Sequence, residues 1–449
     1  RDVLGSRGLG DVYKRQTKNW IDMDKLTAEK YSSLQEAYDS LLEYISNYIS
    51  NDTGFGKKVY RYMISSGSIS GWEVCMMLYE QGVLEPSGSA YEGLSSGRMS
   101  AYDFMINAIT EKTITPAQLA LEPCSGSAVV ADPDTGELLA LVSYPGYDNN
   151  RLSGTVDKDY YEQLRNDKAK PLINKATSLR TAPGSIFKPC SAITGLEQGV
   201  ISTGESIVCT GQYTAVTPSP KCWIYPRSHG AENVSTAIRD SCNVFFYTVG
   251  HRLGMESGGT YNSTKGTDLL KNYAEQLGLA TKSGVEIYEM DPHPSDRDAV
   301  ASAIGQGTHA YSAINLCRYV STLATSGVCH DFTLVSKITD YNGNVIRDNE
   351  PVVSNTMNVS SSTWNAVHQG MRLVIENTAS FKGLPYQAAG KSGTAQENTN
   401  KADHITFISY APYDNPEVAV SVLIPNGYAS SNAAKLTSDI YKIYWGLDK

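Results

Sequence analysis

Three short stretches of the chain carry side chains that could do covalent chemistry. In the first, "SIFK", Ser185 and Lys188 are three residues apart, a spacing that places both side chains on one face of a helix. A serine hydroxyl is a weak nucleophile and needs a neighbouring base. A lysine becomes that base when burial or a nearby cation lowers its pKa. Alone, the pair fits a helix cap followed by a surface lysine better than a site, because S-x-x-K is a weak pattern.

The second stretch is "SCN" at residues 241–243, and the third is "KSGT" at residues 391–394. In the second, Cys242 stands between two polar side chains, and an apolar run from Val244 to Tyr247 predicts the buried face of a helix. In the third, the glycine allows another backbone to approach closely. Alone, "KSGT" fits an ordinary turn better than a functional site. Only the presence of all three stretches in one chain makes chemistry the better interpretation.

The segments around the three motifs show a pattern of strands and helices that predicts an α+β domain. Apolar runs at 128–131 and 138–143 flank the turn-rich "DPDTG", and a second strand-turn-strand pattern occupies 404–424. Helical spacing of apolar residues then marks a terminal helix over 433–443. Strands at both ends, with mostly helical material between them, imply one sheet assembled from distant segments and flanked by helices.

The composition is that of a folded protein with more than one domain. The chain has 449 residues, of which 41% are hydrophobic and 19% charged. Its net charge of −9, without a long basic block, argues against nucleic acid as a partner. No apolar run approaches the roughly 20 residues that span a bilayer, and no signal peptide opens the chain.

The N-terminal region carries no catalytic pattern. Residues 1–16, "RDVLGSRGLGDVYKRQ", resemble a translated sequencing adapter, so we set them aside as an artefact and expect the chain to begin within its gene. Apolar spacing predicts an amphipathic helix over 27–50 and a second helical stretch over 57–84, broken at "SSGSISG". We therefore interpret residues 17–120 as a support or linker region.

Taken in order, SIFK, SCN and KSG reproduce the motif set shared by penicillin-binding proteins and class A β-lactamases. The chain also carries "VVADPDTGELLALVSYPGYDNNR", "IGQG" at 304–307 and "DHITFISYAP". It resembles a class B penicillin-binding protein of the elongation type, closely over 120–449 and loosely over 55–120. The resemblance implies a penicillin-binding transpeptidase domain at 121–449, with an antiparallel sheet flanked by helices and an all-helical subregion. Residues 17–120 would be the remnant of an N-terminal pedestal.

The same resemblance implies a peptidoglycan D,D-transpeptidase that works through a serine acyl-enzyme. In this interpretation Ser185 attacks the D-Ala-D-Ala carbonyl and Lys188 takes its proton. Ser241 relays a proton toward the leaving amine. Asn243 binds the substrate amide and holds Lys188. No cofactor is required for this chemistry.

The third motif is implied to bind the substrate. Lys391 would supply positive potential near the substrate carboxylate, while the hydroxyls of Ser392 and Thr394, around Gly393, would bind it. The backbone N–H groups of Ser185 and Thr394 would form an oxyanion hole. Ser392 departs from the threonine usual in the family, but both side chains carry a hydroxyl.

The resemblance also implies a cellular setting. The substrates would be peptidoglycan stem peptides, the inhibitors β-lactams, and the partner a membrane glycosyltransferase of the elongation machinery. The location would be the extracytoplasmic face of the bacterial membrane, reached through a single N-terminal anchor missing from this fragment. A β-lactamase, and a β-lactam sensor or non-catalytic domain, are the alternatives. The first is disfavoured because the E-x-x-L-N pattern of class A enzymes does not occur between Asn243 and Lys391.

Three cysteines and one histidine near the second motif suggest a metal. Cys209, Cys222, His229 and Cys242 offer three thiolates and an imidazole, a set suited to structural zinc. If the serine and asparagine beside Cys242 face the substrate, its thiol must point behind the site. Some elongation-type members are similar, with a metal held at matching positions.

Two other interpretations of these cysteines stay open. One is a disulfide between Cys209 and Cys222, which suits an extracellular protein, and the other is a set of unlinked buried thiols. Four further cysteines are expected to be buried as small apolar groups: Cys124, Cys190, Cys317 and Cys329.

Overall fold

The computed structural model describes residues 33–111, 113–114, 125–396 and 402–447. Contacts divide the chain into two compact units, Arg1–Leu119 and Ala120–Lys449. The sequence places this division between residues 120 and 121. Among the residues described, no helix combines the length and apolar character needed to cross a membrane.

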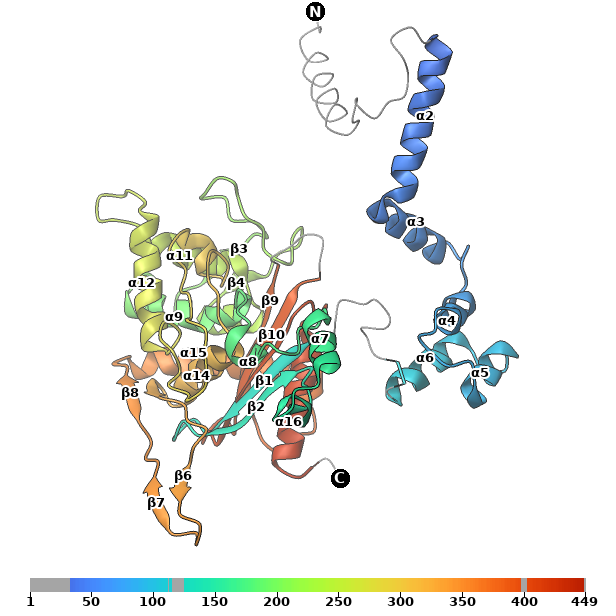
Figure 1. Cartoon of the computed structure of the whole chain (residues 1–449). Coiled ribbons are helices and arrows are strands. Elements are labelled where there is room, and N and C mark those ends of the chain that lie inside the picture. Colours follow the sequence, from blue (N-terminus) through green and yellow to red (C-terminus); the bar gives the residue numbers. More distant parts are fainter. Residues whose placement is uncertain (1–32, 112, 115–124, 397–401, 448–449) are drawn as a thin grey trace, which may run out of the picture. The chain divides into compact units, whose positions relative to one another are not determined.

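The described part of the smaller unit is helical (Figure 1). Its helices are α2 (Leu34–Asn51), α3 (Thr53–Ser65), α4 (Gly71–Glu80), α5 (Gly88–Ser95) and α6 (Ala101–Thr110). Side chains of Ser33, Asp52, Ser70 and Ser100 accept hydrogen bonds from the first turns of four of them, which fixes where these helices begin. The helix expected over 27–50 is confirmed from Leu34 onward, and its first residues lie outside the described ones. The break expected at "SSGSISG" is also confirmed.

A five-stranded antiparallel sheet forms the centre of the larger unit. Its order is β2 (Leu138–Tyr144), β1 (Gly126–Ala131), β11 (Val418–Ile424), β10 (His404–Ala411) and β9 (Ala389–Ala395). The two predicted strand pairs meet in the middle, where Val129 of β1 lies opposite Ser421 of β11. The prediction of one sheet built from distant segments is therefore confirmed, and the KSGT stretch occupies the edge strand β9.

Helices cover both faces of this sheet (Figure 1). On one face α14 (Ala313–Ala324) packs against the side of the sheet that includes Val129 and Leu423. On the other, α16 (Ser430–Tyr444) packs against the side that includes Phe407 and Val422. Such a sheet needs apolar side chains on both faces, which explains why its central strands are almost continuously buried.

The remaining elements lie between and around these layers. The helical ones are η2 (Asn149–Leu152), α7 (Lys158–Asn166), α8 (Lys175–Ser178), η3 (Gly184–Phe187), α9 (Lys188–Glu197), α10 (Val234–Arg239), α11 (Asn243–Leu253), α12 (Ser263–Gln276), α13 (Ala299–Ser302), α15 (Ser361–Glu376) and η4 (Ala379–Phe381). Short strands form three two-stranded pairs: β3 (Ile207–Cys209) with β4 (Gly230–Glu232), β5 (Val328–His330) with β8 (Val353–Thr356), and β6 (Lys337–Thr339) with β7 (Val345–Asp348).

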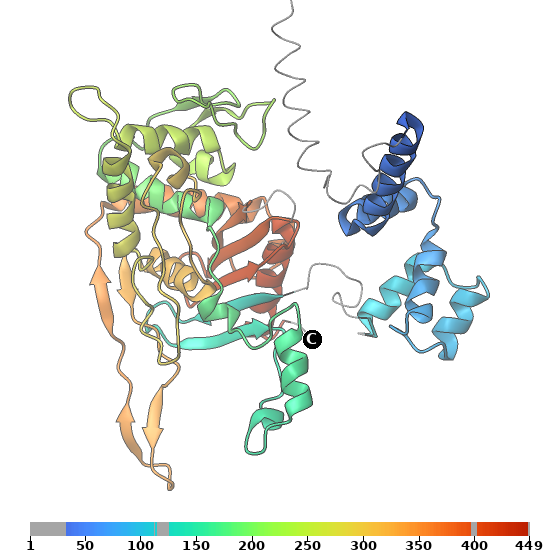
Figure 2. The ribbon, with the colours of Figure 1, turned by 45° about the horizontal axis from the view of Figure 1, so that its top comes forward.

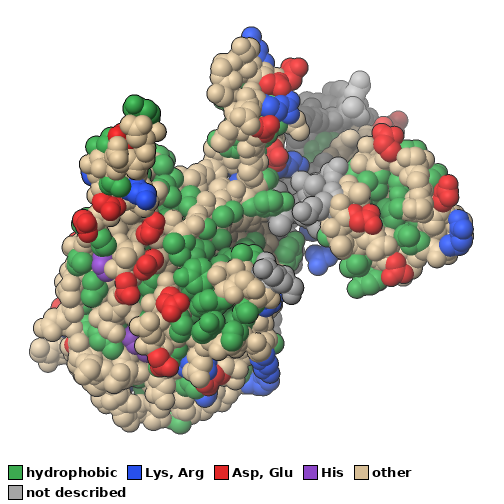
Figure 3. Space-filling view, turned by 90° about the horizontal axis from the view of Figure 1, so that it is seen from below, with side chains coloured by type: hydrophobic (Ala, Val, Ile, Leu, Met, Phe, Trp, Pro, Cys, Tyr) green, Lys and Arg blue, Asp and Glu red, His purple; other side chains and the backbone are tan. Residues whose placement is uncertain are grey.

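Two surface features of the larger unit are visible in the other views. The β6–β7 ribbon projects away from the body of the unit (Figures 1 and 2). Seen from below, apolar side chains gather over one broad area of the surface (Figure 3). Exposed apolar residues on β2 and α16 include Val142, Tyr144 and Ile443.

Candidate active site

The first motif is held in a tight turn at the start of a buried helix. Ser185 lies in η3 and Lys188 begins α9, where Pro189 takes a place in the first turn that needs no N–H. Gly184 has φ of +56° and its Cβ position would collide with the Thr394 carbonyl oxygen, so a side chain does not fit there. The sequence therefore brings the first and third motifs into backbone contact.

The "IGQG" stretch supports the same turn from another side. The N–H of Gly184 donates to the carbonyl of Gly305 at 2.9 Å. Gly305 has φ of +78°, and a Cβ there would overlap the Gly184 carbonyl oxygen. The residue pair at 184 and 305 is thus restricted to glycine by close backbone approach as well as by conformation.

Lys188 joins the first motif to the second. Its side chain is fully buried, and its Nζ donates to the Ser241 carbonyl at 2.7 Å, the Ser241 Oγ at 3.0 Å and the Asn243 Oδ1 at 2.7 Å. An ammonium has three N–H donors, and these contacts use all of them. Burial lowers the pKa of Lys188 to about 7, against the opposing influence of the nearby Cys242 and Cys222 sulfurs.

The second motif occupies a sharp bend between two helices. After α10 ends, Ser241 adopts a left-handed conformation with φ of +52°, which is unfavourable for a residue with a Cβ. Cys242 then acts as the N-cap of α11, accepting from the Phe245 N–H at its Sγ. The predicted burial of residues 244–247 on this helix is confirmed. The bend aims neighbouring side chains in different directions.

The third motif lies on β9, the strand at one edge of the sheet. Lys391 is buried, and its Nζ donates to the Ser392 carbonyl at 3.1 Å. Burial, and then the charge of Lys188, lowers the pKa of Lys391. A Cβ at Gly393 would lie 2.6 Å from the Pro183 carbonyl oxygen, so this glycine also permits contact with the first motif.

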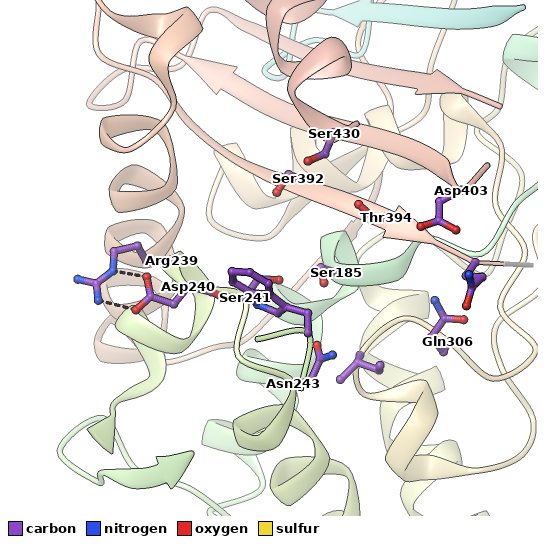
Figure 4. A pocket seen from close by; sticks show the side chains of 13 residues that line it. Ser185, Arg239, Asp240, Ser241, Asn243, Gln306, Ser392, Thr394, Asp403 and Ser430 are labelled. Carbon is purple, nitrogen blue, oxygen red and sulfur yellow. Dashed lines mark hydrogen bonds and ion pairs between the residues drawn. The ribbon is translucent and has the colours of Figure 1, made fainter. Parts of the chain in front are cut away.

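The three motifs converge on one cavity of about 700 Å³ (Figure 4). Ser185, Ser241, Asn243, Ser392 and Thr394 line it. The two lysines of the motifs are buried and are bonded to residues of its wall, Lys188 to Ser241 and Asn243 and Lys391 to Ser392. A nucleophile, a buried amine and several hydroxyls around one open space can support acyl transfer, because attack, proton transfer and binding of the substrate can occur together.

Other residues of the cavity wall were not predicted from the sequence. They are Trp223, Arg239, Asp240, Ile304, Gln306, Gln396, Asp403 and Ser430. The sequence did hold an indication for three of them, because Arg239 and Asp240 immediately precede the second motif and Gln306 belongs to "IGQG". Asp240 receives two bonds from Arg239, at 2.8 and 2.6 Å (Figure 4), and this partner lowers its pKa. The indole N–H of Trp223 donates to the Asp240 carbonyl at 3.0 Å.

The candidate metal ligands meet behind the second motif. One ligand atom from each of Cys209, Cys222, His229 and Cys242 lies within 4.8 Å of all the others. The pairing of β3 with β4 places Cys209 opposite Gly230, and so brings His229 beside it. Cys209 and Cys222 are free thiols in this structure. A further bond runs from the backbone N–H of Asn243 to the Cys222 Sγ at 3.3 Å.

The geometry of this cluster fits a tetrahedral ion. Zinc–sulfur bonds of about 2.3 Å imply sulfur–sulfur separations of about 3.8 Å in a tetrahedron, and small shifts from the observed spacing suffice to reach it. The buried Nε2 of His229 has no hydrogen-bond partner among the described residues. The hydrogen bond from the Cys242 thiol lowers the pKa of Cys222, which favours the thiolate form that binds metals.

The other cysteines behave as expected where they are described. Cys190 and Cys317 are buried in the apolar core. Cys329 is also buried, but it lies beside Arg318 and Asp331 rather than in that core. Cys124 lies outside the described residues.

Comparison with known proteins identifies the larger unit. Residues 126–442 match the model of the penicillin binding protein transpeptidase domain. The chain belongs to this family. Peptidoglycan D,D-transpeptidase MrdA of Haemophilus influenzae is 29% identical over 362 residues, covering 72% of this chain and 53% of the relative. The chain thus spans about half the length of the curated relatives it matches.

Solved structures show the same fold. Pseudomonas aeruginosa PBP2 in complex with WCK 5153 superposes with a TM-score of 0.63 at 26% identity, covering 72% of this chain and 71% of that one. A chain of a peptidoglycan synthase complex that coordinates polymerization and crosslinking gives 0.64 at 26% identity, covering 72% and 56%. The predicted fold class is confirmed, as is the resemblance to elongation-type class B penicillin-binding proteins.

Proposed function

We propose that the chain is the transpeptidase part of a peptidoglycan D,D-transpeptidase that crosslinks stem peptides during cell elongation and is inhibited by β-lactams. One observation carries the proposal. The fully buried Lys188 amine bonds both polar residues of the second motif, and those two residues line the same cavity as Ser185. This arrangement supplies a base of suitable pKa beside a nucleophile.

The reaction follows from these positions. The neutral fraction of Lys188 accepts the Ser185 hydroxyl proton as the oxygen attacks the carbonyl of the penultimate D-alanine. The bond to the terminal D-alanine breaks, and Ser241 passes a proton from Lys188 to the leaving amine. An amine of a second stem peptide then attacks the acyl-enzyme, gives its proton back through the same pair and releases Ser185.

Substrate binding would use the edge strand. Ser392 and Thr394 offer hydroxyls to the substrate carboxylate, and Lys391 adds positive potential from beneath. An extended stem peptide can add to the free edge of β9, where backbone hydrogen bonds fix its register. The N–H groups of Ser185 and Thr394 would hold the oxyanion.

The test is acylation and deacylation with a labelled penicillin. We expect a long-lived adduct on wild-type protein, no adduct on Ser185→Ala, and an unchanged adduct on Ser430→Ala, which alters another serine of the same cavity. An adduct that survives in Ser185→Ala would reject the nucleophile. Turnover of several molecules per second would instead favour the β-lactamase alternative. A stable adduct without release of D-alanine from a D-Ala-D-Ala peptide would favour a sensor.

A second proposal concerns the cluster behind the motif. We infer that Cys209, Cys222, His229 and Cys242 hold a structural zinc ion. Their convergence, the buried unpartnered His229 nitrogen and the soft donor set support it. A bound ion would take no part in the chemistry; it would fix the loop before α11 and, through the Cys222 sulfur, the backbone of Asn243.

Elemental analysis of protein purified without chelator tests this ion. We expect about one zinc per chain, lost in Cys222→Ser and kept in Cys329→Ser, a buried cysteine outside the cluster. Absence of metal together with a mapped Cys209–Cys222 disulfide would reject the zinc site in favour of the disulfide. Absence of metal with free thiols would favour plain buried cysteines.

We also propose the cellular setting. The related chain in a synthase complex that joins polymerization to crosslinking supports a membrane glycosyltransferase as the partner. Such a partner implies membrane anchoring on the extracytoplasmic face. Cell fractionation and co-purification of the full-length protein from its host test both points, and recovery in the cytosol would contradict them.

A further inference from the structure

The cavity continues past the nucleophile in two directions. Figure 4 shows Ser241, Asp240 and Arg239 to one side of Ser185 and Gln306 to the other. Ser185 and Ser241 already have roles in the proposed reaction. Asp240 and Arg239 have none, although both line the cavity. The cavity thus has a wall beside Ser241 that the reaction steps leave unused.

The proposed function places the acceptor amine against this wall. In the first half of the reaction an amine leaves the acyl carbon, and in the second half another amine attacks it, so the two halves are one step in opposite directions. The new C–N bond forms as the bond to the Ser185 oxygen breaks, and the amine proton returns through Ser241. Because Ser241 serves both amines, both occupy the position beside it. The rest of the acceptor then extends along the wall next to Ser241.

The first part of this wall is apolar. Trp223 lines the cavity and is 62% exposed. Its indole N–H, the one polar group of the side chain, already donates to the Asp240 carbonyl at 3.0 Å. The hydrogen bond fixes the ring, and the ring surface that remains is apolar. A hydrocarbon chain that leads away from the acceptor amine can pack against it.

Arg239 lies farther from Ser185 along the wall and has donors to spare (Figure 4). Its Nε and Nη2 donate to the Asp240 carboxylate at 2.8 and 2.6 Å, which engages both carboxylate oxygens. A guanidinium has five N–H donors, and this pair uses two. The Nη1 of Arg239 donates no hydrogen bond to any residue that the structure describes, and the side chain is 33% exposed. A second carboxylate can therefore bind the remaining edge of Arg239, while Asp240 holds the guanidinium in position.

We propose that Arg239 determines the acceptor, and that it selects an aliphatic amine whose chain carries a free carboxylate. The amine lies at Ser241, the chain packs on Trp223, and the carboxylate binds the Nη1 edge of Arg239. Asp240 is a positioning residue, because it acts through the guanidinium it holds. An acceptor with a neutral amide in place of the carboxylate loses the charge-assisted bond and is used less well. This selectivity rests on the proposed transpeptidase function and names the acceptor class for it.

The test measures how the acyl-enzyme divides between an amine and water. The whole chain receives diacetyl-lysyl-D-Ala-D-Ala as donor, with either Nα-acetyl-lysine or Nα-acetyl-lysinamide as acceptor. The two acceptors carry the same amine on the same chain and differ only in the carboxylate. We expect the ratio of transferred to hydrolysed product to be about tenfold higher with the carboxylate acceptor, as for one hydrogen bond to a charged group. Both products come from one acyl-enzyme, so the ratio does not depend on how fast the acyl-enzyme forms.

Variants of the ion pair locate the preference. Arg239→Gln should bring the two acceptors to equal use, and Arg239→Lys should restore part of the difference, because it keeps the charge without the planar fork. The double variant Arg239→Gln/Asp240→Asn should also lose the preference, which excludes an unpaired carboxylate as the cause. The matched control is Arg227→Gln, which removes an exposed arginine that does not line the cavity and should keep the preference. Penicillin labelling verifies that each variant is folded.

The outcomes separate this selectivity from the function on which it rests. If wild-type protein releases D-alanine but shows no preference, including hydrolysis without transfer to either amine, Arg239 does not determine the acceptor. A preference for the amide, a preference that survives in Arg239→Gln, or one that is lost in Arg227→Gln would overturn it equally. In all these cases the acyl-enzyme still forms, and its assignment to Ser185 stands. Only the absence of an acyl-enzyme with both the peptide and penicillin would reject the two proposals together.

Discussion

The two sides of the tripeptide 241–243 differ in what completes them. On the cavity side, Ser241 and Asn243 are held by hydrogen bonds from Lys188, so protein groups alone satisfy the site. On the other side, Cys242 lies with three other possible metal ligands. One of them, His229, has a buried ring nitrogen without a hydrogen-bond partner among the described residues. One bend of the chain can therefore serve both a cavity and a structural cluster, because the left-handed conformation of Ser241 directs neighbouring side chains to different sides.

The largest effect is expected on the cavity side. Lys188→Ala removes both the base and three hydrogen bonds, so acylation by penicillin should fall by about a thousandfold, within the range for a lost general base. The measurement is the acylation rate with a labelled penicillin at saturating concentration.

A matched variant separates chemistry from burial. Lys175 is also a buried lysine, with its Nζ bonded to the Lys170 carbonyl at 3.0 Å, but it lies outside the cavity. Lys175→Ala should keep acylation within a few-fold of wild type while lowering thermal stability. Equal losses in the two variants would mean that Lys188 acts through packing rather than as a base.

An intermediate effect on acylation is expected on the side of the tripeptide that faces the cysteine–histidine cluster. Cys222→Ser weakens the cluster and the sulfur that accepts from the Asn243 N–H, so acylation should fall by about 10- to 100-fold, as for partners that orient a functional group. Cys329→Ser, a buried cysteine elsewhere, should change acylation little. If Cys222→Ser acylates normally, the two sides of the tripeptide are independent.

The sequence predicted the motifs and the central sheet better than it predicted the rest of the cavity wall. The motifs and the strand patterns at both ends of the domain can be recognised from local spacing alone. The strand patterns predicted the sheet, and the motifs predicted Ser185 as a residue of the site. The place of Trp223 in the cavity wall could not be predicted, because only tertiary packing brings this residue to the cavity, whereas Arg239 lies two residues before Ser241 in the sequence.

The pH dependence of acylation gives a smaller effect on the cavity side. Burial lowers the pKa of Lys188 to about 7, and only the neutral amine accepts a proton. Acylation should therefore be constant at alkaline pH and decline as the pH falls through 7, approaching about tenfold per unit below it. A rate profile between pH 5.5 and 8.5, with folding verified by circular dichroism, measures this. A flat profile across pH 7 would assign the base to another group.

The smallest effect on acylation is expected at Ser392, where the family usually has threonine. Ser392 lies on the edge strand β9, opposite Phe407 of β10, and lines the cavity. Ser392→Thr keeps the hydroxyl and adds a methyl group that a strand accommodates well, so acylation should change less than about threefold. Ser392→Ala removes the hydroxyl and should cost about tenfold, the value of one hydrogen bond to a charged group. A large loss in the threonine variant would instead mean that the cavity is shaped around serine, and that substrate size is set at this strand.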